Sequence, residues 1–218
     1  PEAITAWICS HLGIPFGSAA ATGIPVYMPR LGKKAYDGIM AAYTAASRKN
    51  GKKYIPLIKN ATQLHVIEKG AFCGVVLDGS YNLTEANYKT SLQNLVDRVL
   101  ITDKDGNQIG VVEDTAAQQK YGVVQTVYKQ EDGKDAQTEA KALLQTLEQT
   151  GSVTGCPGDS RAVSGYALIV QETTTGLFGK FYIESDTHTF TDGKHEMALT
   201  LAFSNMMDEK EIENQSQG

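Results

Sequence analysis

"GKFYIESDTHTFTDGKHEMALTLAFSN", residues 179–205, places two runs of alternating apolar and polar residues on either side of an Asp-Gly pair, a pattern that predicts a β-hairpin. The same stretch gathers carboxylates and imidazoles, the side chains from which hydrolytic metal sites are built. These candidates are Glu184, Asp186, His188, Asp192, His195 and Glu196. The stretch is therefore either a metal centre or a structural hairpin whose polar face holds two histidines.

The pairing register around Asp192-Gly193 decides between the two interpretations. A two-residue loop pairs Phe190 with His195 and sets three polar side chains against the apolar row of the second strand. The three side chains are those of Glu184, Asp186 and His188, and the apolar row is Met197, Leu199, Leu201 and Phe203. Burial of unpaired charges in this way costs several kcal/mol each.

A type I turn with Gly193 in a left-handed bulge shifts the register by one residue and removes this conflict. Phe181 and Ile183 then share the buried face with the apolar row. The opposite, wet face then holds Glu184, Asp186, His188 and Glu196. We predict this register, in which His188 lies across from Glu196. His188 and His195 then point to opposite sides of the sheet, so we expect no metal site.

Other catalytic patterns are weaker. The sequence has no G-x-S-x-G elbow, phosphate-binding loop, G-x-G-x-x-G or H-E-x-x-H motif. "CPGDSR" groups Cys156, Asp159 and Ser160 without a histidine near them in sequence, and we predict a tight turn there. "DKDGN" (103–107) has its glycine at the fourth position and not at the sixth, which excludes an EF-hand. We therefore predict no catalytic, cofactor-binding or metal-binding residues.

Composition indicates an ordinary soluble globular protein, with 41% apolar and 21% charged residues among 218. No apolar run approaches the ~20 residues that span a bilayer, and no signal segment opens the chain, so we expect no membrane partner. The three cysteines lie far apart and indicate reduced thiols in a cytosolic product. Because the chain begins at Pro1, we expect it to be a piece of a longer protein.

Charge divides the chain near Gly70. Residues 1–70 hold nine Lys and Arg against three Asp and Glu, whereas residues 71–218 hold eleven against twenty-two. We predict a basic α+β domain over 1–70, an acidic β-rich domain over 71–207 and a polar tail over 208–218 that is frayed or belongs to a linker. The basic cluster "RKNGKK" (48–53) lies where a helix should stop and has no aromatic platform, so we expect no nucleic-acid partner.

Hydrophobic periodicity predicts two helices and a hairpin in the basic part. The first helix has one apolar face and ends at Gly13; that face is Ile4, Trp7, Ile8 and Leu12. The second helix ends at Asn50-Gly51, and its apolar face is Ile39, Met40, Tyr43 and Ala46. "KYIPLI" and "TQLHVIE" follow as two strands, with Pro56 on an edge and His65 at the surface.

The acidic part predicts strands with an inserted helix. Two strands meet at residues 105–107, and "DAQTEAKALLQTLEQTG" predicts a helix capped by Asp135 and ended by Gly151. Its apolar stripe is Ala136, Ala140, Leu143, Leu144 and Leu147. The predicted fold class is α+β: a small helix-plus-hairpin domain followed by a β-rich, barrel-like domain with an inserted helix.

The C-terminal block as a whole resembles a known family. Its segments "GDSR", "TGLFGKFYI", "SDTHTF" and "HEMALTLAF" resemble the end of baseplate hub proteins of contractile-tailed bacteriophages. Within these proteins, the block resembles the PBSX-type prophage hubs of the late control protein D superfamily. "AYTAASRKNGKKY" followed by "LHVIEKG" resembles the middle of the same proteins, so the resemblance covers most of the chain.

This resemblance implies a structural protein that is not an enzyme and has no cofactor. Such hubs are homotrimers that join the tail tube to the central spike, each subunit contributing two similar β domains. It further implies assembly in the bacterial cytoplasm and a final place in the baseplate of a virion or tail-like particle. The family's N-terminal β domain is not evident in this sequence.

Two alternatives remain open at this stage. A cell-wall or carbohydrate-binding module would need exposed aromatics, but Trp7, the single tryptophan, is placed by the pattern on an apolar helix face. A peptidoglycan-degrading enzyme would need groups that converge in space. A pocket joining His188, His65 and an acid would favour that alternative.

Overall fold

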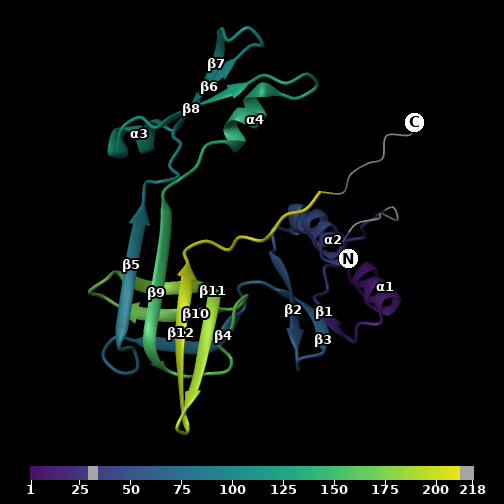
Figure 1. Ribbon diagram of the computed structural model, residues 1–218, viewed down its shortest axis with the longest axis vertical. Coiled ribbons are helices and arrows are strands. Elements are labelled where there is room, and N and C mark those ends of the chain that lie inside the picture. The colour runs from purple at the N-terminus through teal and green to yellow at the C-terminus, as the bar shows by residue number, and fades with distance from the viewer. Residues whose placement is uncertain (29–33, 212–218) are drawn as a thin grey trace. The chain divides into compact units, whose positions relative to one another are not determined.

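The computed structural model describes residues 1–28 and 34–211, which form four helices and twelve strands. It divides into two compact units, Pro1–Asn87 with Gly151–Gly218, and Tyr88–Thr150 (Figure 1). The boundaries predicted at residues 70 and 207 stay predictions, since this division follows other positions. Over the described ranges, no helix is long and apolar enough to cross a membrane.

The first unit begins with two helices and a three-stranded sheet. The helices are α1 (Glu2–Leu12) and α2 (Ala35–Asn50), and the strands are β1 (Phe16–Ala19), β2 (Tyr54–Lys59) and β3 (Gln63–Glu68), in the order β1-β3-β2. Both helices end at glycines with positive φ, Gly13 at 67° and Gly51 at 73°, as predicted. The predicted hairpin and the edge position of Pro56 are confirmed. The parallel partner β1 was not evident in the sequence.

The buried face of α1 differs from the predicted one. Thr5, Ile8 and Cys9 are buried, whereas Trp7 is 53% exposed and stacks on His11 with 5.2 Å between ring centroids. Leu12, also predicted to be buried, is exposed as well. The helix is turned toward α2, because Ile8 lies over Gly38, where a Cβ would be 3.4 Å from the Ile8 Cδ1 atom. The prediction that Trp7 lies on a buried apolar face of the helix is therefore wrong.

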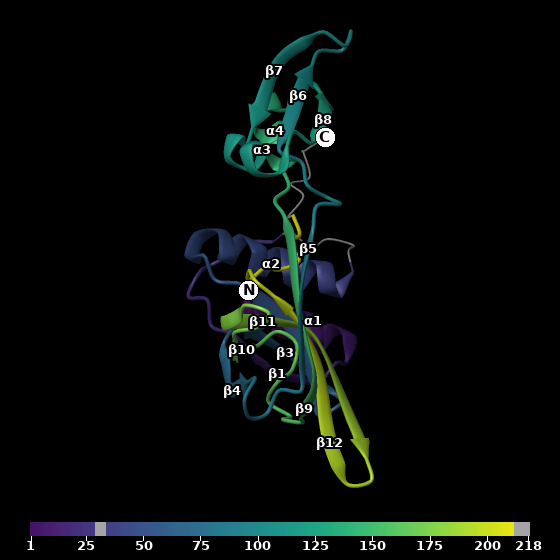
Figure 2. The same cartoon turned by 90° about the vertical axis from the view of Figure 1, so that its left-hand side faces the viewer.

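A six-stranded sheet completes this unit. Its strands are β4 (Phe72–Asp78), β5 (Glu85–Ser91), β9 (Glu148–Pro157), β10 (Ala167–Glu172), β11 (Leu177–Thr191) and β12 (Lys194–Ala202). The order is β4-β10-β11-β12-β9-β5, so the described strands leave β4 and β5 as edges and the sheet is not a closed barrel. Figures 1 and 2 show the turn of the β11–β12 hairpin projecting beyond the neighbouring strands.

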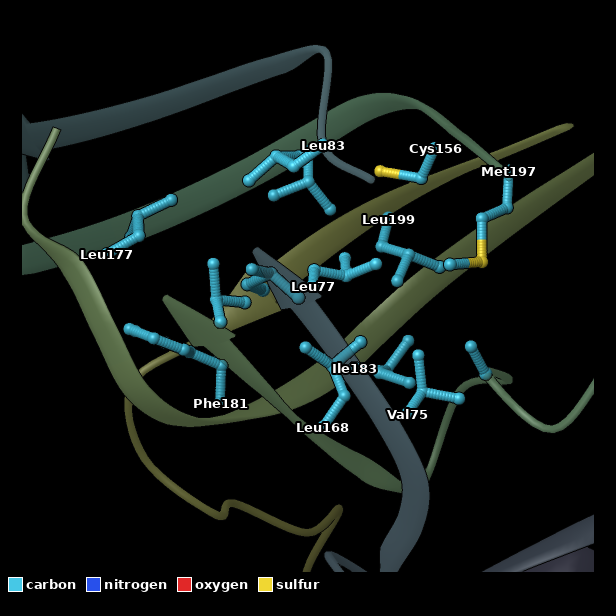
Figure 3. Close-up of a cluster of buried hydrophobic side chains, with 14 residues drawn as sticks. Val75, Leu77, Leu83, Cys156, Leu168, Leu177, Phe181, Ile183, Met197 and Leu199 are labelled. Atoms are coloured by element: carbon cyan, nitrogen blue, oxygen red, sulfur yellow. The ribbon is translucent and has the colours of Figure 1, made fainter. Parts of the chain in front are cut away.

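One apolar cluster holds this sheet together (Figure 3). Its larger members are Val75, Leu77, Leu168, Leu177, Phe181, Ile183, Met197, Leu199 and Leu201. Phe203 packs edge-on against Phe181, with ring centroids 5.1 Å apart. The predicted buried face, with Phe181 and Ile183 beside the apolar row of the second hairpin strand, is confirmed.

The second unit is a three-stranded sheet with two helices. Its strands are β6 (Arg98–Thr102), β7 (Gln108–Glu113) and β8 (Gln125–Lys129), in the order β7-β6-β8, and its helices are α3 (Thr115–Tyr121) and α4 (Ala136–Ala142). The strands predicted on either side of residues 105–107 are confirmed as β6 and β7. Val99 and Ile101 of β6 pack with Ala140 of α4 in the core of this unit.

The long helix predicted from residue 135 is only partly present. Asp135 caps α4 by accepting a hydrogen bond from the Thr138 backbone N–H, as predicted, but α4 ends at Ala142 and residues from Glu148 onward form β9. Gly151 is a buried strand residue, not a helix cap. A Cβ there would meet Leu177 Cδ2 at 3.1 Å and Leu201 Cβ at 3.3 Å. Packing within the sheet thus overrides the helical periodicity of this segment.

In the segment after β12, the described residues 208–211 are not frayed, and the alternative that the tail belongs to a linker stays a prediction. Its described part, up to Glu211, runs to α2 and is held there by hydrogen bonds and ion pairs (Figure 1). The rest of the predicted tail, 212–218, lies outside the described residues. The α+β fold class is confirmed, with an open sheet in place of a closed barrel.

Candidate functional site

The β11–β12 hairpin turns through a two-residue loop. Thr191 pairs with Lys194 and Phe190 with His195. Asp192 and Gly193 both have positive φ, 50° and 75°, as a type I′ turn requires. The one-residue slip predicted at this turn is therefore wrong.

The slip occurs instead at a β-bulge near the other end of the hairpin. Ile183 pairs with Leu201, but the next pair is Ser185 with Thr200, so Glu184 is the extra residue. On the side of the bulge away from the turn, Phe181, Ile183 and Leu201 face the core, as predicted. Between the bulge and the turn, the register is the one that sets Asp186 and His188 on the side of Met197 and Leu199.

The cost of placing Asp186 and His188 on this side is offset by hydrogen bonds to the loop between β9 and β10. Asp186 Oδ1 accepts a hydrogen bond of 2.6 Å from the Ser164 backbone N–H. His188 Nε2 lies 3.1 Å from the Ala162 carbonyl oxygen and 3.6 Å from Asp186 Oδ2. Because these polar atoms have partners, the conflict expected for this register does not arise.

His188 and His195 are hydrogen-bonded to each other, which corrects the prediction that they face opposite sides. His188 Nδ1 lies 2.8 Å from His195 Nε2. A carbonyl oxygen only accepts, so His188 Nε2 carries the proton that is donated to Ala162. In neutral His188 the Nδ1 atom is then the acceptor, and His195 Nε2–H is the donor. The expected pairing of His188 with Glu196 is wrong as well, since Glu196 pairs with Thr189.

His195 is packed on two sides. Phe190 stacks on its ring with 4.1 Å between centroids and 17° between planes. Gly158 lies against the ring, so closely that a Cβ at this position would be 2.1 Å from His195 Cδ2. The Gly158 backbone N–H also donates to the His195 carbonyl oxygen at 2.7 Å. The turn after β9 thus clamps the hairpin at His195.

The residues of "CPGDSR" have structural partners. Cys156 is buried, which raises the pKa of its thiol to about 11 and leaves it protonated at neutral pH. Arg161 hydrogen-bonds the Asp159 carboxylate and lowers its pKa to about 2. Ser160 is exposed in the turn. The predicted turn is present in the loop between β9 and β10, where the Ala162 backbone N–H donates to the Asp159 carbonyl oxygen at 2.9 Å.

The six candidates of the hairpin are divided by the observed register. Asp186, His188 and His195 lie together, whereas Glu184, Asp192 and Glu196 are exposed. Within residues 1–28 and 34–211, no group of three or more His, Cys, Asp or Glu could hold a metal ion. The sequence signal for this cluster was present in "SDTHTF" and "KHEM", but the position of the bulge decided which residues meet.

His65 lies on β3, apart from this cluster. Its Nδ1 atom is 2.9 Å from Ser18 Oγ, and its ring covers Gly17, where a Cβ would be 2.1 Å from Nε2. His65 is half-buried, whereas the sequence pattern predicted a position at the surface. The convergence of His65, His188 and an acid that would favour an enzyme is not observed among their described contacts.

A pocket of about 640 Å³ lies elsewhere, beside the edge strand β5 and the β10–β11 turn. It is lined by hydroxyl-bearing residues and two carboxylates: Glu85, Glu172, Thr84, Ser152, Thr154, Thr174 and Thr175. Glu172 accepts hydrogen bonds from the Thr175 side chain and from the backbone of Thr175 and Thr174, which lowers its pKa to about 2. A carboxyl group with so low a pKa has no proton to donate near neutral pH and is only a weak general base there. No motif or spacing in the sequence had predicted this pocket.

Three comparisons place the chain among known proteins. It is 26% identical over 225 residues to the phage-like element PBSX protein XkdQ of Bacillus subtilis (strain 168), with 93% of this chain and 65% of that protein aligned. The chain therefore spans less than two thirds of that relative's length.

Two solved structures share its fold. The 43 kDa tail protein of prophage MuSo2 from Shewanella oneidensis superposes with a TM-score of 0.58 at 14% identity, over 92% of this chain and 62% of that one. The tail protein of Neisseria meningitidis MC58 gives 0.52 at 12% identity, over 92% and 65%. The YQBQ-like family matches residues 1–202. Since that match covers nearly the whole chain, the protein belongs to the YQBQ-like family.

Proposed function

We propose that this chain is a structural component of a phage tail or of a phage-tail-like particle. The observation that carries the proposal is the shared fold with two prophage and bacterial tail proteins over 92% of the chain. The relationship to a protein of the phage-like element PBSX supports the same class of function.

More specifically, we propose the hub of the baseplate, which joins the tail tube to the central spike. A hub needs β surfaces that pack against neighbouring subunits, and the open six-stranded sheet has two edge strands, β4 and β5, that a neighbour could extend. The full-length protein is proposed to be a homotrimer that assembles in the bacterial cytoplasm and then resides in the baseplate.

The chemistry of the hairpin agrees with a structural role. The His188 imidazole and the Asp186 carboxylate hydrogen-bond backbone atoms of the adjoining loop, the His195 imidazole hydrogen-bonds His188, and the Cys156 thiol is buried. Groups engaged in this way fix the conformation of the hairpin, and none of them lines the pocket beside β5.

The solution mass tests the oligomer. We would measure it by multi-angle light scattering over a range of concentrations, for this chain and for a version extended at its N-terminus by its parent gene. A mass of three times 23.5 kDa for the chain, or three times the extended mass for the longer version, supports the trimer.

Co-purification tests the place in the tail. The tagged chain is expressed together with the tube and spike proteins of its own tail gene cluster. Recovery of both partners with the chain supports the hub. Monomers in every version together with no recovery of either partner would overturn it.

A further inference from the structure

The segment that follows β12 contacts α2 and the two residues Lys53 and Lys69 that flank the β2–β3 hairpin. Asn205 Nδ2 donates to the Lys69 carbonyl oxygen at 2.8 Å, and Lys69 Nζ donates to the Met206 carbonyl oxygen at 2.6 Å. Asn205 and Lys69 thus each donate a side-chain hydrogen bond to a backbone carbonyl of the opposite segment. This reciprocal pair fixes the point at which the segment, Met206–Glu211, leaves the six-stranded sheet.

Apolar and backbone contacts hold the middle of the segment. Met207 packs against the cluster that contains Ile39, Tyr43 and Tyr54. Three residues later, the Lys210 backbone N–H donates to Oγ1 of the buried Thr44 at 3.1 Å. The Thr44 side chain on α2 thereby fixes the position of the segment, although the segment forms no helix or strand.

Opposite charges hold its end. The Arg48 guanidinium donates to both carboxylate oxygens of Glu211 and lies 3.8 Å from Glu209, which also pairs with Lys53 Nζ at 3.2 Å. The bonds from Arg48 lower the pKa of Glu211, so this carboxylate is ionised at neutral pH. The acidic segment thus covers part of the basic cluster 48–53.

These charge contacts are exposed and therefore reversible. The Arg48 side chain is 52% exposed and that of Glu211 is 68% exposed. Exposed ion pairs are individually weak and are screened by salt, with a Debye length of about 10 Å at 0.1 M. The segment's own tether supplies a high effective concentration, which favours docking within one molecule when the protein is dilute.

We propose that the face formed by Thr44, Arg48, Lys53 and Lys69 is a docking site for an acidic peptide segment, and that it accepts Met206–Glu211 of a second copy of this chain in place of its own. The chemistry that is recognised is a methionine followed by acidic residues in extended conformation. Exchange becomes favourable where copies are concentrated or where a molecule's own segment is detached. The proposal does not depend on the baseplate role.

A pair of complementary variants tests the exchange. The acceptor is the chain ended at Ser204, whose site is open. The donor is the full chain with Arg48→Glu, whose own site is impaired while its segment is intact. With a fluorescent label on the donor, the two are mixed in 50 mM NaCl and followed by fluorescence anisotropy. We expect the acceptor to bind the labelled donor, and a second acceptor that also carries Arg48→Glu to bind it at least about tenfold more weakly.

A labelled peptide with the sequence of residues 204–211 gives the matched controls. We expect the acceptor to bind it, with an affinity that falls by about tenfold between 50 and 500 mM NaCl. Glu211→Arg in the peptide should weaken binding to the acceptor by about tenfold and restore it to the acceptor that carries Arg48→Glu. A folded acceptor that binds neither peptide nor donor would overturn the proposal, as would binding that is insensitive to these charges.

A second design covers an acceptor that fails to fold. A protease site is inserted between Phe203 and Ser204 of the full chain, which is purified folded and then cut. We expect the released segment to stay bound in 50 mM NaCl, to wash off in 500 mM NaCl and to be replaced by added peptide. Retention in high salt would rule out exchange. A trimeric mass together with such retention would refute this proposal and leave the hub proposal intact.

Discussion

The two ends of the β11–β12 hairpin are formed by the same two strands, but only the end near the turn has polar side chains on the buried side. Below the bulge, Ile183 and Leu201 pair and are fully buried in an apolar cluster. Beyond it, His188 pairs with Met197, and polar atoms approach the same side of the sheet. The base, residues 181–183 and 201–203, is held by the removal of apolar surface from water. The tip, residues 185–200, adds to the burial of Met197 and Leu199 the hydrogen bonds that Asp186 and His188 make to the loop after β9.

One extra residue thus changes which side chains a strand presents on each face. Without the bulge at Glu184, either the base would turn Phe181 and Ile183 outward or the tip would turn Asp186 and His188 outward, away from His195. The bulge allows the apolar base and the hydrogen-bonded tip to face the same side.

The largest expected effect is at the base. Ile183→Ala leaves a cavity in the cluster and is expected to lower the free energy of unfolding by about 3 kcal/mol. Phe190→Ala is the matched change at the tip, where the ring is 72% exposed, and should cost under about 1 kcal/mol. Urea denaturation followed by circular dichroism measures both. Equal costs would contradict the proposed division of the hairpin.

The next largest loss of stability is expected at the contact between Gly158 and His195. Gly158→Ala introduces a Cβ where the imidazole lies and is expected to cost about 2 kcal/mol by overpacking. The same change in a His195→Ala background should cost much less, because the clashing ring is gone. A double-mutant cycle by urea denaturation measures this coupling. Independent effects of the two substitutions would show that the turn does not clamp the hairpin.

The hydrogen bonds of His188 are tested by His188→Phe. This change leaves the Ala162 carbonyl and His195 Nε2 without a partner and is expected to cost about 1–3 kcal/mol. Thr189→Ala, on the opposite face of the same strand, is the control and should lie within about 0.5 kcal/mol of the original protein. Faster hydrogen exchange of the amides near residue 188, with unchanged exchange at residue 183, would place the effect at the tip.

Much of the fold could be predicted from local signals. Gly13 and Gly51 end helices because αL glycines satisfy the last carbonyl groups, and Asp135 begins one because its carboxylate accepts a backbone N–H. The apolar alternation of residues 181–183 and 197–203 identified the buried side of the hairpin. These signals act over a few residues and are legible in a single sequence.

The errors concern contacts between distant segments. Gly151 looked like a helix end, but its lack of a Cβ serves close packing on Leu177 and Leu201. The bulge at Glu184 depends on a loop that supplies the Ser164 N–H and the Ala162 carbonyl as partners for the tip. Nothing in the alternation of residues 184–196 reveals those partners, so the register was assigned to the wrong position. The candidate cluster was therefore recognisable by composition but not by geometry.

The smallest expected effect is a pH-dependent change in stability that arises from Asp159, beside the hairpin tip. Arg161 holds the pKa of Asp159 at about 2, below the ordinary value of about 3.9 expected in the unfolded chain. Because the folded pKa is the lower one, ionised Asp159 stabilises the fold above about pH 4, and this contribution is lost as the pH falls through about 2. Asp159→Asn should therefore be less stable than the original protein at pH 5, with a gap that closes toward pH 2.

A matched carboxylate makes this measurement specific. Glu172, in the β10–β11 turn, has a pKa of about 2 as well, but its partners are Thr174 and Thr175 and not the hairpin tip. Urea midpoints at pH 5, 3.5 and 2.5 are compared for Asp159→Asn and Glu172→Gln, each alone and combined with Gly158→Ala. If Asp159 acts by holding the turn against His195, its pH-dependent gap shrinks when Gly158→Ala has already displaced that turn, whereas the gap for Glu172 does not. A gap for Asp159 that ignores Gly158→Ala would mean that its ion pair with Arg161 stabilises only its own loop.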